Sequence, residues 1–163
     1  MTCAPTMPWP HRPAPPTASG PGVAVLAPVP ACAREMSRLR RRVRTAVRDT
    51  YPVGAAVAAG PGLADAADRL ADDLERLDLV LEELVSNGQR HGRAPVHVAV
   101  HAADGGWVVA VTDAAPDLPP RPVTDRDPAK GGMGLQMVAR LADDHGWSTS
   151  GGRKTVWALL ALR

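Results

Sequence analysis

Leucine and alanine side chains recur at steps of three and four residues from residue 63 to residue 90. This spacing places them on one face of an α-helix, and Gly92 stands just beyond, in the position of a C-cap. Glu83 and Asn87 are four residues apart near the end of the stretch, so they lie one turn apart on one side of the helix. The pattern therefore predicts a long amphipathic helix that carries a carboxylate and an amide side by side.

Weaker patterns precede the long helix. Residues 22–29 alternate β-branched and small side chains, and Pro28 and Pro30 restrict such a strand to the edge of a sheet. Apolar side chains at helical spacing predict a second helix over residues 31–50, with arginines over most of its remaining surface. Glycines and prolines in residues 51–62 predict a loop between the two helices.

Two hairpins and one more helix follow the long helix. Valines alternate with other residues over 96–100 and again over 107–112, with a turn sequence between them, which predicts a hairpin. A further helix is predicted over residues 134–144, with Gly146 ending it. Residues 147–162 predict a closing hairpin, because two glycines stand between its apolar runs.

This order of elements predicts an α+β fold. We expect a two-layer sandwich in which a mixed, mostly antiparallel sheet carries helices on one face. Residues 1–21 contain seven prolines and no periodicity, which predicts a disordered or extended arm. Residues 22–163 are then long enough for a single domain with its own core. Residues 113–131, with five prolines, predict a long loop of the kind that forms lids and binding loops.

Charge is unevenly distributed along the chain, although the formal net charge is only +2. Residues 31–53 carry seven arginines against two acidic side chains, whereas residues 63–92 carry eight acidic side chains against three arginines. This balance argues against wholesale nucleic-acid binding. The arginine-rich helix is either a solvated face or a docking surface for an acidic partner, and the sequence leaves both open.

The cysteines and the hydropathy of the chain indicate in which cellular compartment the protein is expected. The two cysteines, Cys3 and Cys32, lie outside the expected core, so no disulfide framework is indicated. No run of roughly 18 apolar residues exists, so no membrane span is predicted and a cytoplasmic protein is expected. His97 and His101 share one face of a predicted strand, but without a third ligand nearby a metal site there is disfavoured.

Three further positions add candidate chemistry to Glu83 and Asn87. Asp113 follows a predicted strand, where its carboxylate can accept a hydrogen bond from an amine such as that of adenine. Gly131–Leu135 begin a predicted helix, where glycines let backbone N–H groups approach a phosphate. Thr155 follows two glycines and two cations, which either contact a ligand or stabilise a tight turn. Glu83 can take a proton, and Asn87 can offer its amide oxygen to Mg²⁺.

These motifs together resemble the GHKL ATPases, which have the Bergerat (histidine-kinase-like ATPase) fold, and among them the small anti-sigma-factor serine kinases of actinobacterial type. The helix motif of that family, Glu-Leu-Val-Thr-Asn-Ala-x-x-His-Gly, matches residues 83–92 with two substitutions. The family's glycine-box aspartate matches Asp113, although the glycines that usually follow it are replaced. Its second glycine box matches residues 132–135, and its final Gly-Lys-Thr-Val-Trp motif matches residues 152–157. The resemblance covers about residues 31–162.

The resemblance implies roles for individual side chains. Glu83 would act as the general base, Asn87 would bind Mg²⁺ and Asp113 would recognise adenine. ATP and Mg²⁺ are the implied cofactors, and Asn87 is the implied metal ligand. The nucleotide-binding residues that it implies are Asn87, Arg90, His91, Gly92, Asp113, Pro116, Gly131, Gly132, Met133, Gly134, Leu135 and Thr155.

The resemblance also implies a function. We expect an ATP- and Mg²⁺-binding regulator that binds a sigma factor or a STAS-type anti-sigma antagonist, or phosphorylates a serine of that antagonist. Formation of a homodimer is left open, and neither direct nucleic-acid binding nor membrane association is expected. The alternative is a nucleotide-binding interaction module without kinase activity. A catalytic domain serving a histidine kinase is less favoured, because the sequence shows neither the long lid nor the phosphoacceptor helix of that class.

Overall fold

The computed structural model of this chain describes residues 9–12, 14–19, 25–50, 63–104, 106–121 and 133–161. Parts of the sequence predictions lie outside these residues, namely the start of the first strand, the loop at 51–62, most of the second half of the predicted lid, and Gly131 with Gly132. The elements follow along the chain as β1 (Val25–Pro28), α1 (Ala33–Thr50), α3 (Leu63–His91), β2 (His97–Ala103), β3 (Gly106–Asp113), α4 (Gly134–Leu141), β4 (Asp144–Ser150) and β5 (Arg153–Leu160).

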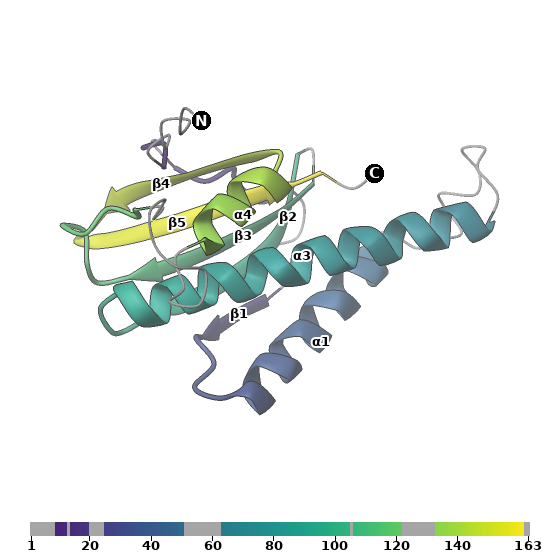
Figure 1. The fold of residues 1–163 in the computed structure, drawn as a ribbon, viewed down its shortest axis with the longest axis horizontal. Coiled ribbons are helices and arrows are strands. Elements are labelled where there is room, and N and C mark those ends of the chain that lie inside the picture. Colours follow the sequence, from purple (N-terminus) through teal and green to yellow (C-terminus); the bar gives the residue numbers. More distant parts are fainter. Residues whose placement is uncertain are drawn as a thin grey trace, which may run out of the picture.

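A five-stranded sheet forms one layer of the domain, in the order β1-β2-β3-β5-β4. All four strand pairs are antiparallel. Within the described residues, parallel pairing is confined to an isolated bridge between His11 and Trp147. β1 lies at one edge of the sheet, where the prediction from Pro28 placed it. Helices α1, α3 and α4 cover one face (Figure 1), so the predicted α+β fold with helices on one face is confirmed.

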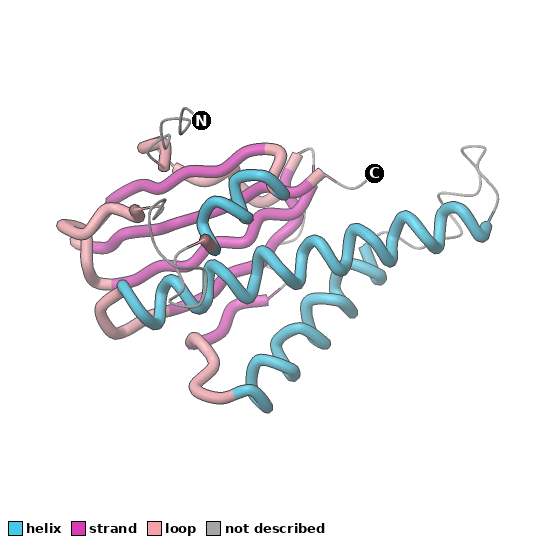
Figure 2. The backbone as a smooth tube through the Cα atoms, viewed as in Figure 1, coloured by secondary structure: helices cyan, strands magenta, loops and turns pink. Residues whose placement is uncertain are grey.

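The leucine face of α3 forms the centre of the core. Leu74, Leu77, Leu81 and Leu84 are buried in one cluster with the valines on the helix-facing side of β2 and β3, which are Val98, Val100, Val109 and Val111. Burying one such side chain contributes about 1.5–3 kcal/mol, so this face alone is enough to hold α3 across the sheet (Figure 2). The fixed helix in turn sets the direction of the polar side chains at its end.

Ion pairs between α1 and α3 account for part of the uneven charge of the sequence. Arg40 Nη1 lies 2.5 Å from Glu82 Oε1, and Arg44 Nη2 lies 2.6 Å from Asp78 Oδ2. The first pair is well exposed, and such pairs contribute little. Asp78 is only 12% exposed, so the second pair carries more of the attachment. The basic and acidic helices are therefore partners within the chain.

The closing part of the chain departs from the prediction at one boundary. α4 ends at Leu141 instead of residue 144, and β4 already begins at Asp144. Gly146 therefore lies inside a strand and does not end a helix. A Cβ atom at Gly146 would lie 2.6 Å from Arg12 Cγ, so a passing N-terminal segment explains the glycine better than a helix end does.

That N-terminal segment is extended over its described residues and pairs with the free edge of β4. Trp147 N donates to Pro10 O at 3.0 Å, and Arg12 N donates to Trp147 O at 2.8 Å. The arginine side chain adds a hydrogen bond of 3.1 Å to Asp144 Oδ1.

The arm continues on the sheet face opposite the helices. His101 Nε2 lies 3.1 Å from Pro16 O, and Ser19 N donates to Ala102 O at 2.9 Å. On this face a second, smaller hydrophobic cluster gathers Ala103, Val108, Ala110 and Trp157. His101, which the sequence offered as a weak metal ligand, is instead covered by the arm.

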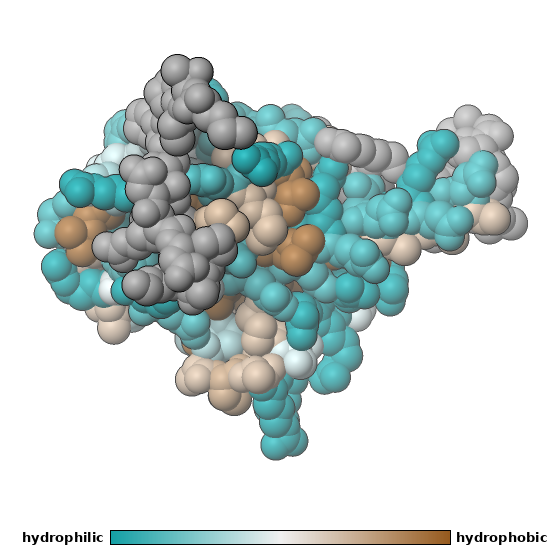
Figure 3. All heavy atoms as spheres, viewed as in Figure 1, coloured by the Kyte–Doolittle hydropathy of each residue, from teal (hydrophilic) through white to brown (hydrophobic). Residues whose placement is uncertain are grey.

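The outer surface is mainly hydrophilic on the face shown in Figure 3, above all over the first half of α3, which projects beyond the sheet. Among the described helices, none is both long and apolar enough to cross a membrane. Exposed large apolar side chains are scattered singly over β1, α3, the 114–121 loop and the start of α4. Single exposed side chains of this kind are usual on a protein surface.

Candidate functional site

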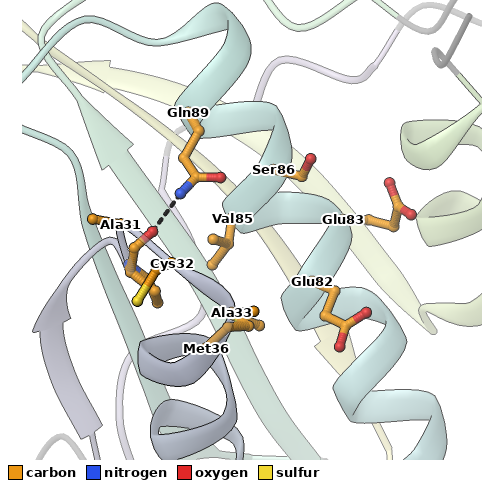
Figure 4. A pocket seen from close by; sticks show the side chains of 10 residues that line it. Ala31, Cys32, Ala33, Met36, Glu82, Glu83, Val85, Ser86 and Gln89 are labelled. Carbon is orange, nitrogen blue, oxygen red and sulfur yellow. Dashed lines mark hydrogen bonds between the residues drawn. The ribbon is translucent and has the colours of Figure 1, made fainter.

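The end of α3 directs Glu83 toward the start of α4. A Cβ atom built on Gly134 would lie 2.0 Å from Glu83 Oε2, so only glycine leaves room for the carboxylate at the first turn of α4. Figure 4 shows Glu83 pointing away from α1 and toward this helix, whereas the neighbouring Glu82 takes another direction. The two adjacent acids therefore lie on different sides of α3. Glu82 is paired with Arg40 of α1, and Glu83 lies beside Gly134 of α4.

Glu83 and Asn87 line one small cavity of about 40 Å³ between α3 and α4. Both side chains are half-buried, and we find no hydrogen-bond partner for either among the described residues. The cavity brings together six of the predicted site residues. Its lining consists of Glu83, Asn87, Arg90, His91, Arg121, Gly134 and Leu135.

A larger cleft of about 640 Å³ adjoins this cavity and shares part of its lining. Its volume lies within the roughly 300–1,000 Å³ that is usual for small-molecule sites. The lining of the cleft is more apolar than polar, and Arg90 of α3 and Arg121 of the loop after β3 add positive charge to it. Its lining consists of Asn87, Arg90, His91, Gly92, Asp117, Leu118, Pro119, Pro120, Arg121 and Lys154.

A buried ion pair forms the floor of the cleft. Lys154 Nζ lies 3.2 Å from Asp113 Oδ2, and both side chains are 2% exposed. The pair follows directly from the strand register, because β3 and β5 place these two residues opposite each other. Asp113 Oδ1 also accepts a hydrogen bond of 2.7 Å from Ala115 N. A Cβ atom at Gly92 would lie 2.9 Å from Asp113 Oδ2, so glycine after α3 lets the helix end sit over the carboxylate.

The first half of the predicted lid forms a fixed wall of the cleft. Ala114 N donates to Arg93 O at 2.8 Å, and Arg93 Nη1 donates back to Ala114 O at 3.2 Å. Farther along, Leu118 O accepts a hydrogen bond of 2.7 Å from Lys154 Nζ. These bonds tie the loop to the end of α3 and to β5, so residues 114–121 hold their place without a ligand.

The start of α4 supplies a site of favourable potential for anions. Met133 occupies the N-cap position, and no side chain there caps the first backbone N–H groups of the helix. Free N–H groups and the helix dipole both favour a negative charge at such a point. Met133 itself is 52% exposed, and its side chain does not line the cavity described above.

Other predicted site residues are not brought to the cleft. Thr155 Oγ1 lies 2.8 Å from Thr112 Oγ1, a pair that alternates with Asp113 and Lys154 and so lies on the opposite face of the sheet. Pro116 is half-buried in the loop but does not line the cleft. Gly151 and Gly152, with φ of +57° and +72°, form the β4–β5 turn, which supports the tight-turn alternative for this segment.

The sequence marked Lys154 only as one of two cations that either contact a ligand or stabilise a turn, and it favoured Thr155 as the site residue, whereas the structure places Lys154 in the lining of the cleft. The signal was present in the pattern of β5. Lys154 falls in phase with Val156, Ala158 and Leu160, which are all buried. A lysine on the buried face of a strand needs a buried acidic partner. Asp113, which directly follows the predicted strand 107–112, was the acid that the sequence offered for this role.

The donor set suits a magnesium nucleotide better than a protein-only metal site. Among the described residues, no group of three or more His, Cys, Asp or Glu side chains converges on one point. Mg²⁺ is usually held by one or two protein oxygens together with phosphates and water. The amide oxygen of Asn87, half-buried beside the open start of α4, fits that pattern.

The family assignment agrees with this geometry. Residues 29–160 match the family model described as the histidine kinase-like ATPase domain. The chain therefore belongs to the histidine kinase-like ATPase family, which implies that this domain binds ATP. The match begins just after β1 and includes every element from α1 to β5, and both residues of the buried ion pair lie within it.

Two known proteins illustrate the relationship. Over 86 residues the chain is 33% identical to the signal transduction histidine-protein kinase AfsQ2 of Streptomyces coelicolor, covering 45% of this chain and 16% of that kinase. The chain thus spans only a small part of that relative's length. The crystal structure of the RsbU and RsbW domains of Rv1364c from Mycobacterium tuberculosis is 18% identical, with a TM-score of 0.49, over 85% of this chain and 32% of that one.

Proposed function

We propose that this chain is an ATP- and Mg²⁺-binding regulator that binds a sigma factor or its anti-sigma antagonist and transfers a phosphoryl group to a serine of that antagonist. One observation carries the proposal. A carboxylate and an amide that have no hydrogen-bond partner among the described residues line a small cavity with the start of α4, and the adjoining cleft is lined by a lysine that is paired with a buried acid. Such an arrangement can bind the adenine ring of a nucleotide and present its γ-phosphate beside the carboxylate that acts as general base.

Each group has a role that its position supports. Asn87 provides an oxygen for the metal ion, which when bound neutralises charge on the phosphates. The N–H groups at the start of α4 favour the phosphate oxygens, and Arg90 and Arg121 add positive charge at the rim of the cleft. Asp113 accepts a hydrogen bond from the amine of adenine. The chain's own groups thereby position the reactants, which supplies most of the catalysis in phosphoryl transfer.

Glu83 is the general base of the proposed transfer. The serine hydroxyl oxygen forms a bond to the γ-phosphorus, and the bond from that phosphorus to the bridging oxygen of ADP breaks. Glu83 accepts the hydroxyl proton, and ADP leaves with the electron pair of the broken bond. The Glu83 carboxylate lies at the first turn of α4, beside the helix start that we propose for the phosphates, and a general base must lie within hydrogen-bond reach of the proton that it takes.

Substitution of Glu83 tests the proposal. Glu83→Gln keeps the shape and removes the charge, so ATP affinity should stay near that of the wild type while phosphotransfer falls by about 10²–10⁴-fold. Binding is measured by calorimetry and transfer with radiolabelled ATP and a purified STAS-type antagonist. Glu82→Gln is the matched control, since Glu82 pairs with Arg40 and should leave both quantities unchanged.

A nucleotide-binding module without kinase activity is the second candidate. It is favoured by the fixed wall at residues 114–121, which lacks the glycines that let the family's loop move. A wild type that binds ATP but transfers no phosphoryl group to any antagonist would support the module. Equal loss of binding and transfer in Glu83→Gln would instead place Glu83 among the groups that hold the metal.

The outward arginines of α1 are the proposed docking surface for the acidic partner. Arg40 and Arg44 are taken up by α3, whereas Arg41 and Arg48 line the same shallow groove without an ion pair among the described residues. Replacing Arg41 and Arg48 by Glu should weaken partner binding, more so at low salt, and leave ATP affinity unchanged. Unchanged partner affinity would make this helix a solvated face.

A further inference from the structure

Lys154 is a buried cation that reaches the cleft from below. It is 1% exposed, and the lining of the cleft includes Lys154 but not Asp113. Lys154 therefore borders the cleft, whereas Asp113 is paired with Lys154 without lining the cleft. A buried lysine is costly unless it is paired, and the ion pair with Asp113 compensates this one.

The pair has donors and acceptors left for a ligand. An ammonium group has three donors; Lys154 Nζ donates to Leu118 O and forms an ion pair with Asp113 Oδ2, which leaves at least one donor. An ionised carboxylate can accept about four hydrogen bonds, and within the described residues Asp113 accepts from Ala115 N and forms the ion pair with Lys154. The pair thus presents a donor and an acceptor next to each other.

Adenine carries the complementary pattern on one edge. Its exocyclic amine is a donor, and the adjacent ring nitrogen N1 is an acceptor. Guanine reverses this order, because it has a carbonyl acceptor beside an N1–H donor. A site that hydrogen-bonds two neighbouring groups discriminates more sharply than one that meets a single group.

We propose that Lys154 is a second base-reading residue, which donates a hydrogen bond to N1 of adenine while Asp113 accepts from the amine. This inference rests on the ATP binding in the proposed function and adds to it the source of its base specificity. The same contact lets the nucleotide stiffen the cleft wall, because Lys154 also holds Leu118 O. A lysine that only braces the loop would make no contact with the base.

An ATP analogue tests the contact without any mutation. In 1-deaza-ATP a C–H group replaces N1, which removes the acceptor and keeps the amine. We expect the wild type to bind 1-deaza-ATP about 10- to 100-fold more weakly than ATP by calorimetry, the range for a hydrogen bond to a charged group. The ligand control is 7-deaza-ATP, which is changed away from this edge and should bind like ATP.

Two variants test whether Lys154 causes the difference in affinity between ATP and 1-deaza-ATP. Lys154→Met should bind ATP more weakly and lose the preference for ATP over 1-deaza-ATP, so that the affinity ratio falls to about one. Arg153→Met, an exposed neighbour in the same strand, should keep the wild-type ratio.

The outcomes separate the two claims. Equal wild-type affinity for ATP and 1-deaza-ATP, or a preserved ratio in Lys154→Met, overturns the role of Lys154 and leaves ATP binding intact. A wild type that binds neither nucleotide overturns the proposed function together with it. If Lys154→Met does not fold, equal wild-type affinities for ATP and 1-deaza-ATP would still overturn the role of Lys154.

Discussion

Single residues in the cleft differ in whether their charge is already compensated. Asp113 and Lys154 neutralise each other where both are buried, whereas Glu83 and Asn87 are half-buried and have no partner within the described residues. Removing one member of a buried pair leaves the other charge uncompensated. The unpaired groups are instead available to a ligand, which is why substitutions at the two ends of the site should have different effects.

Replacing Asp113 tests the base-recognition end. Asp113→Asn puts an amide where the amine of adenine needs an acceptor, so ATP affinity should fall by about tenfold or more, as measured by calorimetry. The melting temperature of the variant should be measured as well, because Lys154 loses the negative charge of its partner and the fold can be destabilised.

The wild type provides the matched comparison. GTP should bind much more weakly than ATP, since its ring carries an acceptor at the position of the amine. Equal affinity for the two nucleotides would contradict the assignment of Asp113 whatever the variant does.

The sequence predicted the helix-borne residues of the site better than the strand-borne ones. The four-residue spacing of Glu83 and Asn87 determines their shared side of a helix, and the structure brings both to one cavity. Strand residues alternate between faces, so the choice between Lys154 and Thr155 depends on the register of β5 against β3. The motif favoured Thr155, and the alternation instead places Lys154 at the cleft.

Among the elements, the edge strand β4 depends on a segment that has no regular structure of its own. The arm supplies a backbone donor and a backbone acceptor to Trp147, which covers part of an edge that would otherwise be open to pairing with other chains. Gly146 makes this possible, because a Cβ atom there would lie 2.6 Å from Arg12 Cγ and 3.1 Å from Pro10 O.

Replacing Gly146 should release the arm from β4. Gly146→Ala forces the arm outward, so the Trp147 amide, which donates to Pro10 O, should exchange with solvent faster in hydrogen-exchange experiments. The overpacking should also lower the free energy of unfolding by about 1–3 kcal/mol. Thr149→Ala, at an exposed position of the same strand, is the control and should leave Trp147 protected. Unchanged protection in Gly146→Ala would show that the arm does not hold this edge.

Element order was predictable, and element ends were less so. Apolar periodicity predicted the long helix, both hairpins and the edge strand. The helix at 134–144 was predicted too long, because Gly146 suggested a helix end. A glycine is needed at position 146 for another reason, which is the close contact with Arg12 and Pro10 of the arm. Similarly, the proline content of the arm could not reveal the β4 edge on which it lies.

On the scale of the whole molecule, one hydrophobic core holds the helices on the sheet. The leucines of α3 and the Leu39, Val43 and Val47 side chains of α1 are buried in the same cluster, and ion pairs between α1 and α3 add to this packing. A further link runs from α3 to the end of β5, where Arg76 donates to Ala161 O and lies 3.4 Å from Asp73. Part of the charge that looks segregated in the sequence is therefore matched inside the fold.

Acid should weaken the packing of the arm against β4. Burial lowers the pKa of His145 from its ordinary 6.5; the Asp144 carboxylate opposes this shift and Arg12 adds to it. The unfolded chain therefore takes up a proton first as the pH falls, so the contribution to stability is full above about 6.5 and is lost as the pH drops through the lower pKa of the folded state.

Urea unfolding of the wild type and of His145→Gln at a series of pH values checks this. The free energy of unfolding of the wild type should fall more steeply between neutral and mildly acid pH than that of the variant. Trp9→Ala should also flatten the dependence, because the Trp9 ring lies 4.5 Å from the imidazole and helps to bury it. Parallel pH profiles for all three proteins would show that His145 does not couple to folding.

The central claim is that the cleft holds ATP, with Asn87 providing the oxygen for Mg²⁺. Calorimetric titration of the purified wild type and of Asn87→Ala with ATP, each with and without Mg²⁺, tests it most directly. We expect tighter ATP binding by the wild type when Mg²⁺ is present, and loss of most of that gain in Asn87→Ala with little change in the Mg²⁺-free affinity. An Asn87→Ala protein that binds ATP with Mg²⁺ like the wild type would make Asn87 a structural residue of α3 and contradict the account.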